Sequence, residues 1–130
     1  GMDQMQWGPI YWKFLHGIVK HKYSKQHHDR SVYIMNALAF ILPCSICRSN
    51  YLLKLIDSPV PQKESRETLQ RWLVDLHNEV NRDLGKPILP YTKAILGVSS
   101  QINEALKMFI LITQYNIQYN VKDKKLKKDN

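Results

Sequence analysis

The chain has 130 residues, enough for one domain that buries a core without cross-links, so we expect a single active site. No apolar run approaches the roughly 20 residues that span a bilayer, so we expect a soluble protein with no membrane span. The net charge of +8 is compatible with nucleic-acid binding, but five of the last nine residues are lysine. A solvated, disordered tail over 121–130 explains much of this charge, and we expect no nucleic-acid partner.

The first predicted helix runs from about Met5 to Tyr23, because apolar residues recur there at spacings of three and four. Pro9 suits the first turn of such a helix. The polar segment 24–29 follows, and we interpret it as a loop. Three histidines in and near this loop are expected to be solvated: His21, His27 and His28.

Two further helices are predicted on either side of Pro43. The segment from Val32 to Leu42 has helical spacing and ends there, because the residue before a proline is pushed out of the α region. A third helix should begin at once and stop at the proline-rich segment 58–61. Its predicted apolar face consists of Cys44, Cys47, Tyr51, Leu52, Leu55 and Ile56.

The fourth predicted helix has the clearest pattern, running from about Glu64 to Gly85, with Pro87 two residues beyond. A short helix is expected around Thr92–Leu96, and an apolar helix from Ser99 to about Tyr119. No segment shows sustained period-two alternation. We therefore predict an all-α domain over 1–120: a four-helix bundle with a short fifth helix and an additional C-terminal helix.

The two cysteines of the chain, Cys44 and Cys47, lie three residues apart at a predicted helix start. They share one helical face, close enough to form a disulfide or to bind one metal. A bridge across two residues constrains the unfolded chain very little, which disfavours a structural role. The helix N-terminus favours a thiolate at Cys44, and Arg48 adds positive charge one turn away.

Three hypotheses for this pair follow. A closed zinc site needs four ligands, but there is no second cysteine pair and the histidines lack zinc-finger spacing. A thioredoxin-like site needs a strand before the cysteines, whereas the preceding segment has a helical pattern. The third hypothesis places the pair beside an electron acceptor in a helical bundle, and residues other than the cysteines must supply the evidence for it.

Three segments supply that evidence, because they resemble motifs of the Erv/ALR family of FAD-linked sulfhydryl oxidases in the family's order. They are WGPIYWKFLH at 7–16, LPCSIC at 42–47 and LHNEVNRDLGKP at 76–87, and they cover roughly residues 7 to 90. The resemblance implies a four-helix bundle that cradles FAD, with a short extra helix and usually a homodimer. The helix pattern agrees with this architecture.

The resemblance also implies a role for each cysteine. Cys47 would lie against the flavin ring, and the more accessible Cys44 would be attacked by the substrate thiolate. A mixed disulfide at Cys44 would release Cys47 as a stabilised thiolate that passes electrons to the flavin at short range. Dioxygen would then reoxidise the flavin and give hydrogen peroxide.

Cofactor contacts are implied on the first and fourth helices and just beyond. Trp12 and His16 are four residues apart, as are His77 and Asn81, so each helix can present a ring and a hydrogen-bonding group on one face. The implied FAD-binding residues are Gly8, Tyr11, Trp12, His16, His77, Asn78, Val80, Asn81, Leu84, Lys86 and Tyr91.

Some of these residues have specific expected roles. Gly8 would let the cofactor approach the backbone, Lys86 would pair with a phosphate, and Tyr91 is the nearest aromatic residue for covering the adenine. Without the resemblance, Trp12 would be interpreted as a core residue, and His16 as a packed or solvated side chain.

The chain departs from the family in its cysteines. Relatives in cells commonly carry a shuttle pair and a further bridge, whereas this sequence has neither, so substrate must reach Cys44 directly or through a redox carrier protein. Minimal relatives of this kind resemble those of large DNA viruses, which predicts action in the host cytoplasm or in the virion.

The C-terminal helix has no clear counterpart in the family, and we expect it to form a dimer surface or to begin a further domain. The rival hypothesis for the whole chain is a non-enzymatic helical interaction module. In that case the cysteines bind zinc or are inert, and the basic tail binds an acidic partner.

Overall fold

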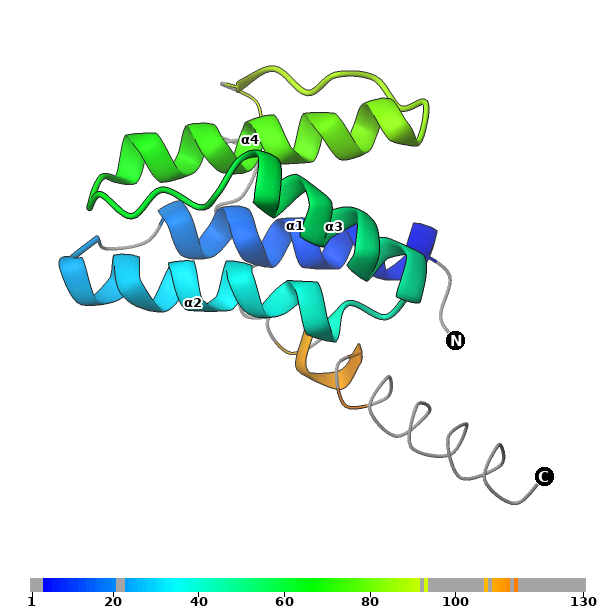
Figure 1. Ribbon diagram of the computed structural model, residues 1–130, viewed down its shortest axis with the longest axis horizontal. Helices are drawn as coiled ribbons and strands as arrows, with labels where there is room; N and C mark the ends of the chain where they lie inside the picture. The colour runs from blue at the N-terminus through cyan, green and yellow to red at the C-terminus, as the bar shows by residue number, and fades with distance from the viewer. Residues whose placement is uncertain are drawn as a thin grey trace.

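The computed structural model describes residues 4–20, 23–91, 93, 107, 109–112 and 114, and these form an all-helical bundle without a strand (Figure 1). The predicted all-α class is therefore confirmed. No helix among the described residues is long and apolar enough to cross a membrane. The described residues up to 91 contain four helices: α1 (Gln4–Lys20), α2 (Lys25–Ile41), α3 (Ser45–Asp57) and α4 (Arg66–Asp83).

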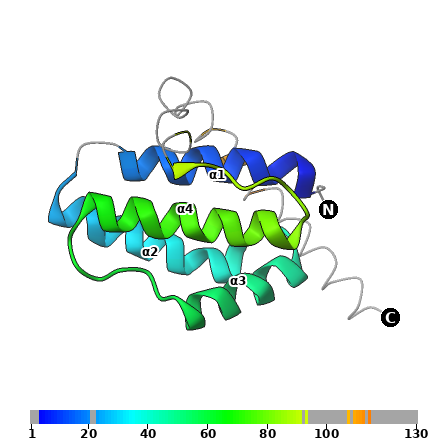
Figure 2. The same cartoon turned by 90° about the horizontal axis from the view of Figure 1, so that it is seen from above.

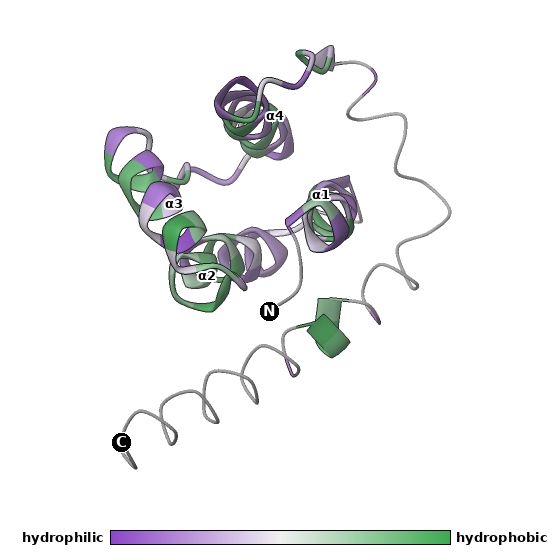
Figure 3. Cartoon of the chain, turned by 90° about the vertical axis from the view of Figure 1, so that its right-hand side faces the viewer, coloured by the Kyte–Doolittle hydropathy of each residue, from purple (hydrophilic) through white to green (hydrophobic). Residues whose placement is uncertain are grey.

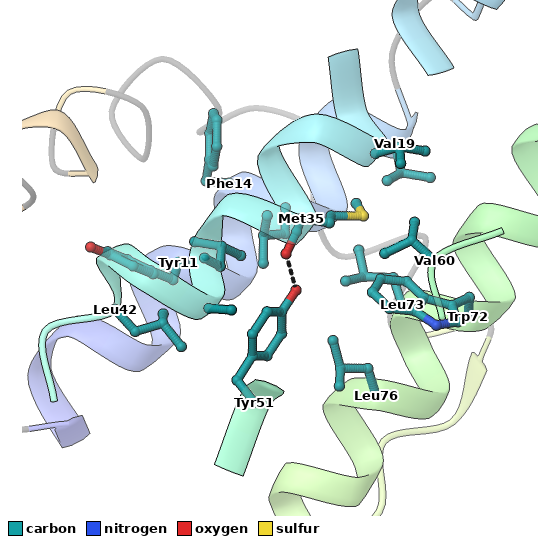
Figure 4. Close-up of a cluster of buried hydrophobic side chains, with 14 of the residues drawn as sticks. Tyr11, Phe14, Val19, Met35, Leu42, Tyr51, Val60, Trp72, Leu73 and Leu76 are labelled. Carbon is teal, nitrogen blue, oxygen red and sulfur yellow. Dashed lines mark hydrogen bonds between the residues drawn. The ribbon is translucent and has the colours of Figure 1, made fainter. Parts of the chain in front are cut away.

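The helices surround one apolar core. Helix α1 packs against α4 and α2, and α2 packs against α3, so that the four helices enclose a common interior (Figure 3). The core holds fully buried side chains such as Leu73 of α4 and Met35 of α2. Tyr51 of α3 reaches into it and donates its hydroxyl to the carbonyl oxygen of Met35 (Figure 4).

Helix α2 begins earlier than predicted, so the loop expected at 24–29 is wrong from Lys25 onward. Ser24 is the N-cap, and its hydroxyl accepts a hydrogen bond from the backbone N–H of His27 at 3.1 Å. A capped first turn needs no apolar residues, because the cap and the later turns stabilise it. The polar composition of the segment concealed this turn.

The expected solvation of the nearby histidines is also wrong where they are described. His28 is 1% exposed, and its Nε2 lies 2.9 Å from the carbonyl oxygen of Pro61. His27 is half-buried and contacts the carbonyl oxygen of Ile18 at the end of α1. His21 lies outside the described residues. His27 and His28 therefore fasten α2 to the segments beside it.

Two expectations about helix faces need correction. Pro9 lies inside α1 rather than in its first turn. In α3, Cys44, Cys47, Tyr51 and Leu55 contact the core, as predicted, whereas Leu52 and Ile56 are 42% and 67% exposed. Helix α3 contacts the bundle along a narrow line at spacings of three and four, so the neighbouring apolar positions face outward.

Helix α4 ends at Asp83, and Gly85 follows its C-cap Leu84 as the predicted closing glycine. The φ of Gly85 is +70°, a left-handed value that glycine adopts without strain. Beyond it the chain runs back along α4 (Figure 2). Two backbone hydrogen bonds close the turn, from Gly85 N–H to the carbonyl of Arg82 and from Lys86 N–H to the carbonyl of Asn81.

The C-terminal helix expected over Ser99–Tyr119 is described only at 107, 109–112 and 114, and these residues are helical. Ile112 is buried, and Phe109 packs against Tyr11 and Phe14 with ring centroids 4.6 and 4.5 Å apart. This segment therefore lies against α1. Most of the short helix expected at 92–96, and the whole basic tail, lie outside the described residues.

Candidate redox site

The two cysteines lie at the junction of α2 and α3, and both are half-buried free thiols. Cys44 is the N-cap of α3, and its Sγ accepts a hydrogen bond from the backbone N–H of Cys47 at 3.2 Å. This donor and the positive end of the helix dipole favour negative charge on the Cys44 sulfur. The predicted placement of the pair at a helix N-terminus is confirmed.

Cys47 has a different environment. Its thiol donates to Oε1 of Gln4 on α1, with the two heavy atoms 3.6 Å apart. Burial, with the nearby Cys44, raises the pKa of Cys47, although its own backbone N–H and the charge of Arg48 partly offset this. The surroundings of Cys47 therefore favour the thiol, which differs from the stabilised thiolate expected there.

Both cysteines line an apolar cavity of about 370 Å³ whose walls come from α1, α2, α3 and α4. Of the expected cofactor residues, Gly8, Tyr11, Trp12, Val80 and Leu84 line the same cavity. A further wall residue, Trp7, has a buried indole N–H that finds no hydrogen-bond partner among the described residues.

A second cavity, of about 310 Å³, adjoins the first and has polar and charged walls. Trp12 and His77 stack in its wall, with ring centroids 3.9 Å apart and planes 7° apart. Asn81 lines it as well, and three lysines surround it: Lys13, Lys86 and Lys93. Such walls suit an anionic ligand with a planar group.

His16 and His77 form a pair in this second cavity, with His16 Nε2 and His77 Nδ1 3.0 Å apart. Burial lowers the pKa of each to about 4, and the charge of the other histidine contributes at His16, as Lys86 does at His77. Both imidazoles are therefore neutral at neutral pH. One ring nitrogen of the pair donates and the other accepts.

The two cavities share wall residues and form one elongated site with an apolar end at the cysteines and a cationic end at the lysines. The shared residues are Gln4, Gly8, Trp12 and Leu84. A Cβ added at Gly8 would meet only Cγ of Gln4, at 3.9 Å, so Gly8 leaves open space in the wall. The site therefore fits a long ligand with an apolar ring at one end and negative charge along its length.

Two expected cofactor residues lie elsewhere. The amide of Asn78 donates to the carbonyl of Leu89 at 3.0 Å and accepts from its N–H at 2.8 Å. The ring of Tyr91 lies beneath the guanidinium of Arg71, 4.9 Å from the ring centroid. Neither Asn78 nor Tyr91 lines either of these two cavities. Asn78 instead fixes the segment that carries Lys86.

Three polar residues in the wall of the second cavity were not predicted: Gln4, Lys13 and Lys93. A signal for Gln4 was present, because Gln4, Gly8, Trp12 and His16 recur every four residues and so lie on one face of α1. The lysines gave no signal, since single lysines are common on helix surfaces.

Among the described residues, no group of three or more His, Cys, Asp or Glu side chains is placed to hold a metal ion. The fold and the free cysteine pair define a helical redox protein whose dithiol faces an elongated ligand cavity.

The family model described as Erv1 / Alr matches residues 9–105, and the chain belongs to this family. It is 32% identical over 111 residues to a "probable FAD-linked sulfhydryl oxidase" of Acanthamoeba polyphaga mimivirus, covering 82% of this chain and 78% of that protein.

Two further similarities come from yeast. Over 89 residues the chain is 36% identical to the mitochondrial FAD-linked sulfhydryl oxidase of Saccharomyces cerevisiae, covering 65% of this chain but 46% of that protein. The crystal structure of the yeast Erv1 core superposes with a TM-score of 0.67 at 27% identity, covering 76% of this chain and 86% of that one.

Proposed function

We propose that the chain oxidises dithiols of protein substrates to disulfides at Cys44 and Cys47, with FAD as cofactor and dioxygen as final acceptor. Its family membership and the names of its relatives make it an FAD-dependent thiol oxidase. The observation that carries the proposal is the free cysteine pair in the wall of an apolar cavity that continues into a cationic one.

The two ends of the site suit the two parts of FAD. Tyr11, Val80 and Leu84 provide apolar contacts for a flavin ring beside the cysteines. The lysines of the second cavity suit the diphosphate, and the Trp12–His77 stack offers a flat surface for a second ring. When bound, FAD would accept two electrons from the reduced cysteines and pass them to dioxygen, which gives hydrogen peroxide.

Disulfide exchange begins at Cys44. A substrate thiolate attacks Sγ of Cys44 in the Cys44–Cys47 disulfide. The S–S bond breaks, and its electron pair passes to Sγ of Cys47. A second substrate thiolate then attacks the substrate sulfur of the mixed disulfide, which releases oxidised substrate and a thiolate on Cys44. The backbone N–H of Cys47 favours that anion, so Cys44 is a good leaving group.

In this proposal, substrate delivers its electrons to Cys44 directly or through a redox carrier protein. We further propose that the chain assembles as a homodimer. Large apolar side chains are exposed on α2 and α3, among them Tyr33 (76%), Phe40 (77%) and Leu53 (62%), and apolar surface of this kind is typical of contact faces.

The proposed place of action is the host cytoplasm or the virion of a large DNA virus. This is supported by the similarity to the mimivirus relative and by 30% identity over 94 residues to an FAD-linked sulfhydryl oxidase of African swine fever virus.

Purified protein tests the function. We expect a yellow sample that binds FAD stoichiometrically and consumes oxygen when given a dithiol, with peroxide as product. A colourless sample that cannot be reconstituted with FAD, or one that holds stoichiometric zinc, would favour the interaction module instead.

A further inference from the structure

We propose that Gln4 is a positioning residue for Cys47, whose side-chain amide bonds the sulfur in both protonation states. Oε1 accepts from the thiol, and after rotation of the amide Nε2 donates to the thiolate. The inference rests on the proposed function, because Cys47 is the sulfur that delivers electrons to the cofactor.

The geometry brings Gln4 to the point where the parts of the site meet. It lies on α1, 43 positions before Cys47, yet its Oε1 is 3.6 Å from Sγ of that residue. Gln4 is half-buried and lines both cavities. It follows the spacing of Gly8 and Trp12 on the face of α1 that forms the shared wall.

A glutamine amide suits this position because it carries an acceptor and a donor on one rotatable group. The S–H···O bond it makes to the thiol is weak, whereas an N–H bond to a thiolate is charge-assisted and stronger. The net effect of Gln4 is therefore to favour ionisation of a sulfur that burial otherwise keeps protonated.

The charged and titratable groups near Cys47 are few among the described residues. Cys44 is the N-cap of α3, and Arg48 lies in α3, where its guanidinium is bound to the carbonyl of Leu42. Lys54 and Asp83 line the same cavity, but they form an ion pair with each other at 2.7 Å. The side-chain amide of Gln4 on α1 thus adds an uncharged group that can accept from the thiol of Cys47 and donate to its thiolate.

The test measures ionisation of Cys47 directly, in FAD-loaded protein carrying Cys44→Ser. Serine preserves the N-cap, and Cys47 becomes the single reactive thiol. The rate of alkylation by iodoacetamide is followed against pH. We expect Gln4→Leu to raise the midpoint by about one pH unit, and Gln4→Glu to raise it further, because a carboxylate can only accept and repels the thiolate.

The matched control is Gln6→Leu, an exposed position on the same helix that lines neither cavity. Equal midpoints in Gln4→Leu and Gln6→Leu would overturn the proposal. If Gln4→Leu does not fold, an unshifted midpoint in Gln4→Glu overturns it instead. Failure of the proposed function is seen separately, as absence of bound FAD. Alkylation of Cys47 requires neither the cofactor nor turnover, so in that case the same rates are measured on the FAD-free protein.

Discussion

Residue identities at the cationic end of the site determine how well the cofactor is held. His77 stacks on Trp12 and shares a hydrogen bond with His16. We expect His77→Ala to weaken FAD retention and to destabilise the chain by about 1–3 kcal/mol, because the buried His16 loses its partner. Dialysis against buffer and urea unfolding measure these effects. Glu79→Ala, exposed two residues along α4, is the control and should change neither.

The same histidine pair predicts a pH dependence. His16 has a pKa of about 4 in the folded chain against 6.5 as its ordinary value, so between these pH values the unfolded state binds more protons. The contribution of His16 to the free energy of unfolding is therefore fully present above about pH 6.5 and is lost as the pH falls through about 4. This contribution amounts to about 3 kcal/mol.

Urea unfolding of FAD-free protein between pH 7 and 4 tests this dependence. In His16→Leu the fall in the free energy of unfolding should be smaller, because the leucine does not titrate. Equal pH slopes in wild type and variant would show that His16 is protonated alike in the folded and unfolded states.

Prediction at the residue scale succeeded where a sequence pattern reported a shared helix face. The second cavity is lined by five residues whose spacings of four predicted a shared helix face: Gly8, Trp12, His16, His77 and Asn81. Asn78 was expected beside them, but it is adjacent to His77 and so points in another direction, toward Leu89. Helical spacing could not reveal that contact, because Leu89 belongs to the segment that returns along α4.

At the scale of elements, the segment after α4 is fixed by side-chain bonds. We expect Asn78→Leu to free the backbone of Leu89 and thereby to misplace Lys86, which lines the second cavity. The chain should lose about 1–3 kcal/mol of stability and bind FAD more weakly.

Amide hydrogen exchange of Leu89 tests this prediction, because its N–H is bonded to the side chain of Asn78 at 2.8 Å. Exchange should become at least about tenfold faster in Asn78→Leu. Glu79→Leu, at the neighbouring exposed position, should leave it unchanged. Unaltered exchange in Asn78→Leu would show that other contacts hold the segment.

The helices themselves were predictable to different degrees. Helix α4 was placed within two residues at each end, because an apolar pattern and Gly85 mark it. The part of α2 before Val32, about two turns, was missed, since its stability comes from the Ser24 cap and from contacts made by His27 and His28 with distant backbone. Such contacts belong to tertiary structure and leave no local pattern.

At the scale of the whole molecule, the central claim is that electrons pass from a dithiol substrate through the cysteine pair to bound FAD. The bundle places that pair in the wall of the apolar cavity, with both sulfurs held at the start of α3. The chemistry therefore requires both Cys47 and the cofactor, whereas binding of the cofactor does not require the sulfur of Cys47.

The most direct measurement is the visible absorbance of FAD-loaded protein mixed with dithiothreitol in the absence of oxygen. We predict rapid bleaching of wild-type protein, and bleaching more than about 100-fold slower in Cys47→Ser, which should keep its FAD. Bleaching of Cys47→Ser at the wild-type rate, or wild-type protein that binds FAD and is not bleached, would contradict the account.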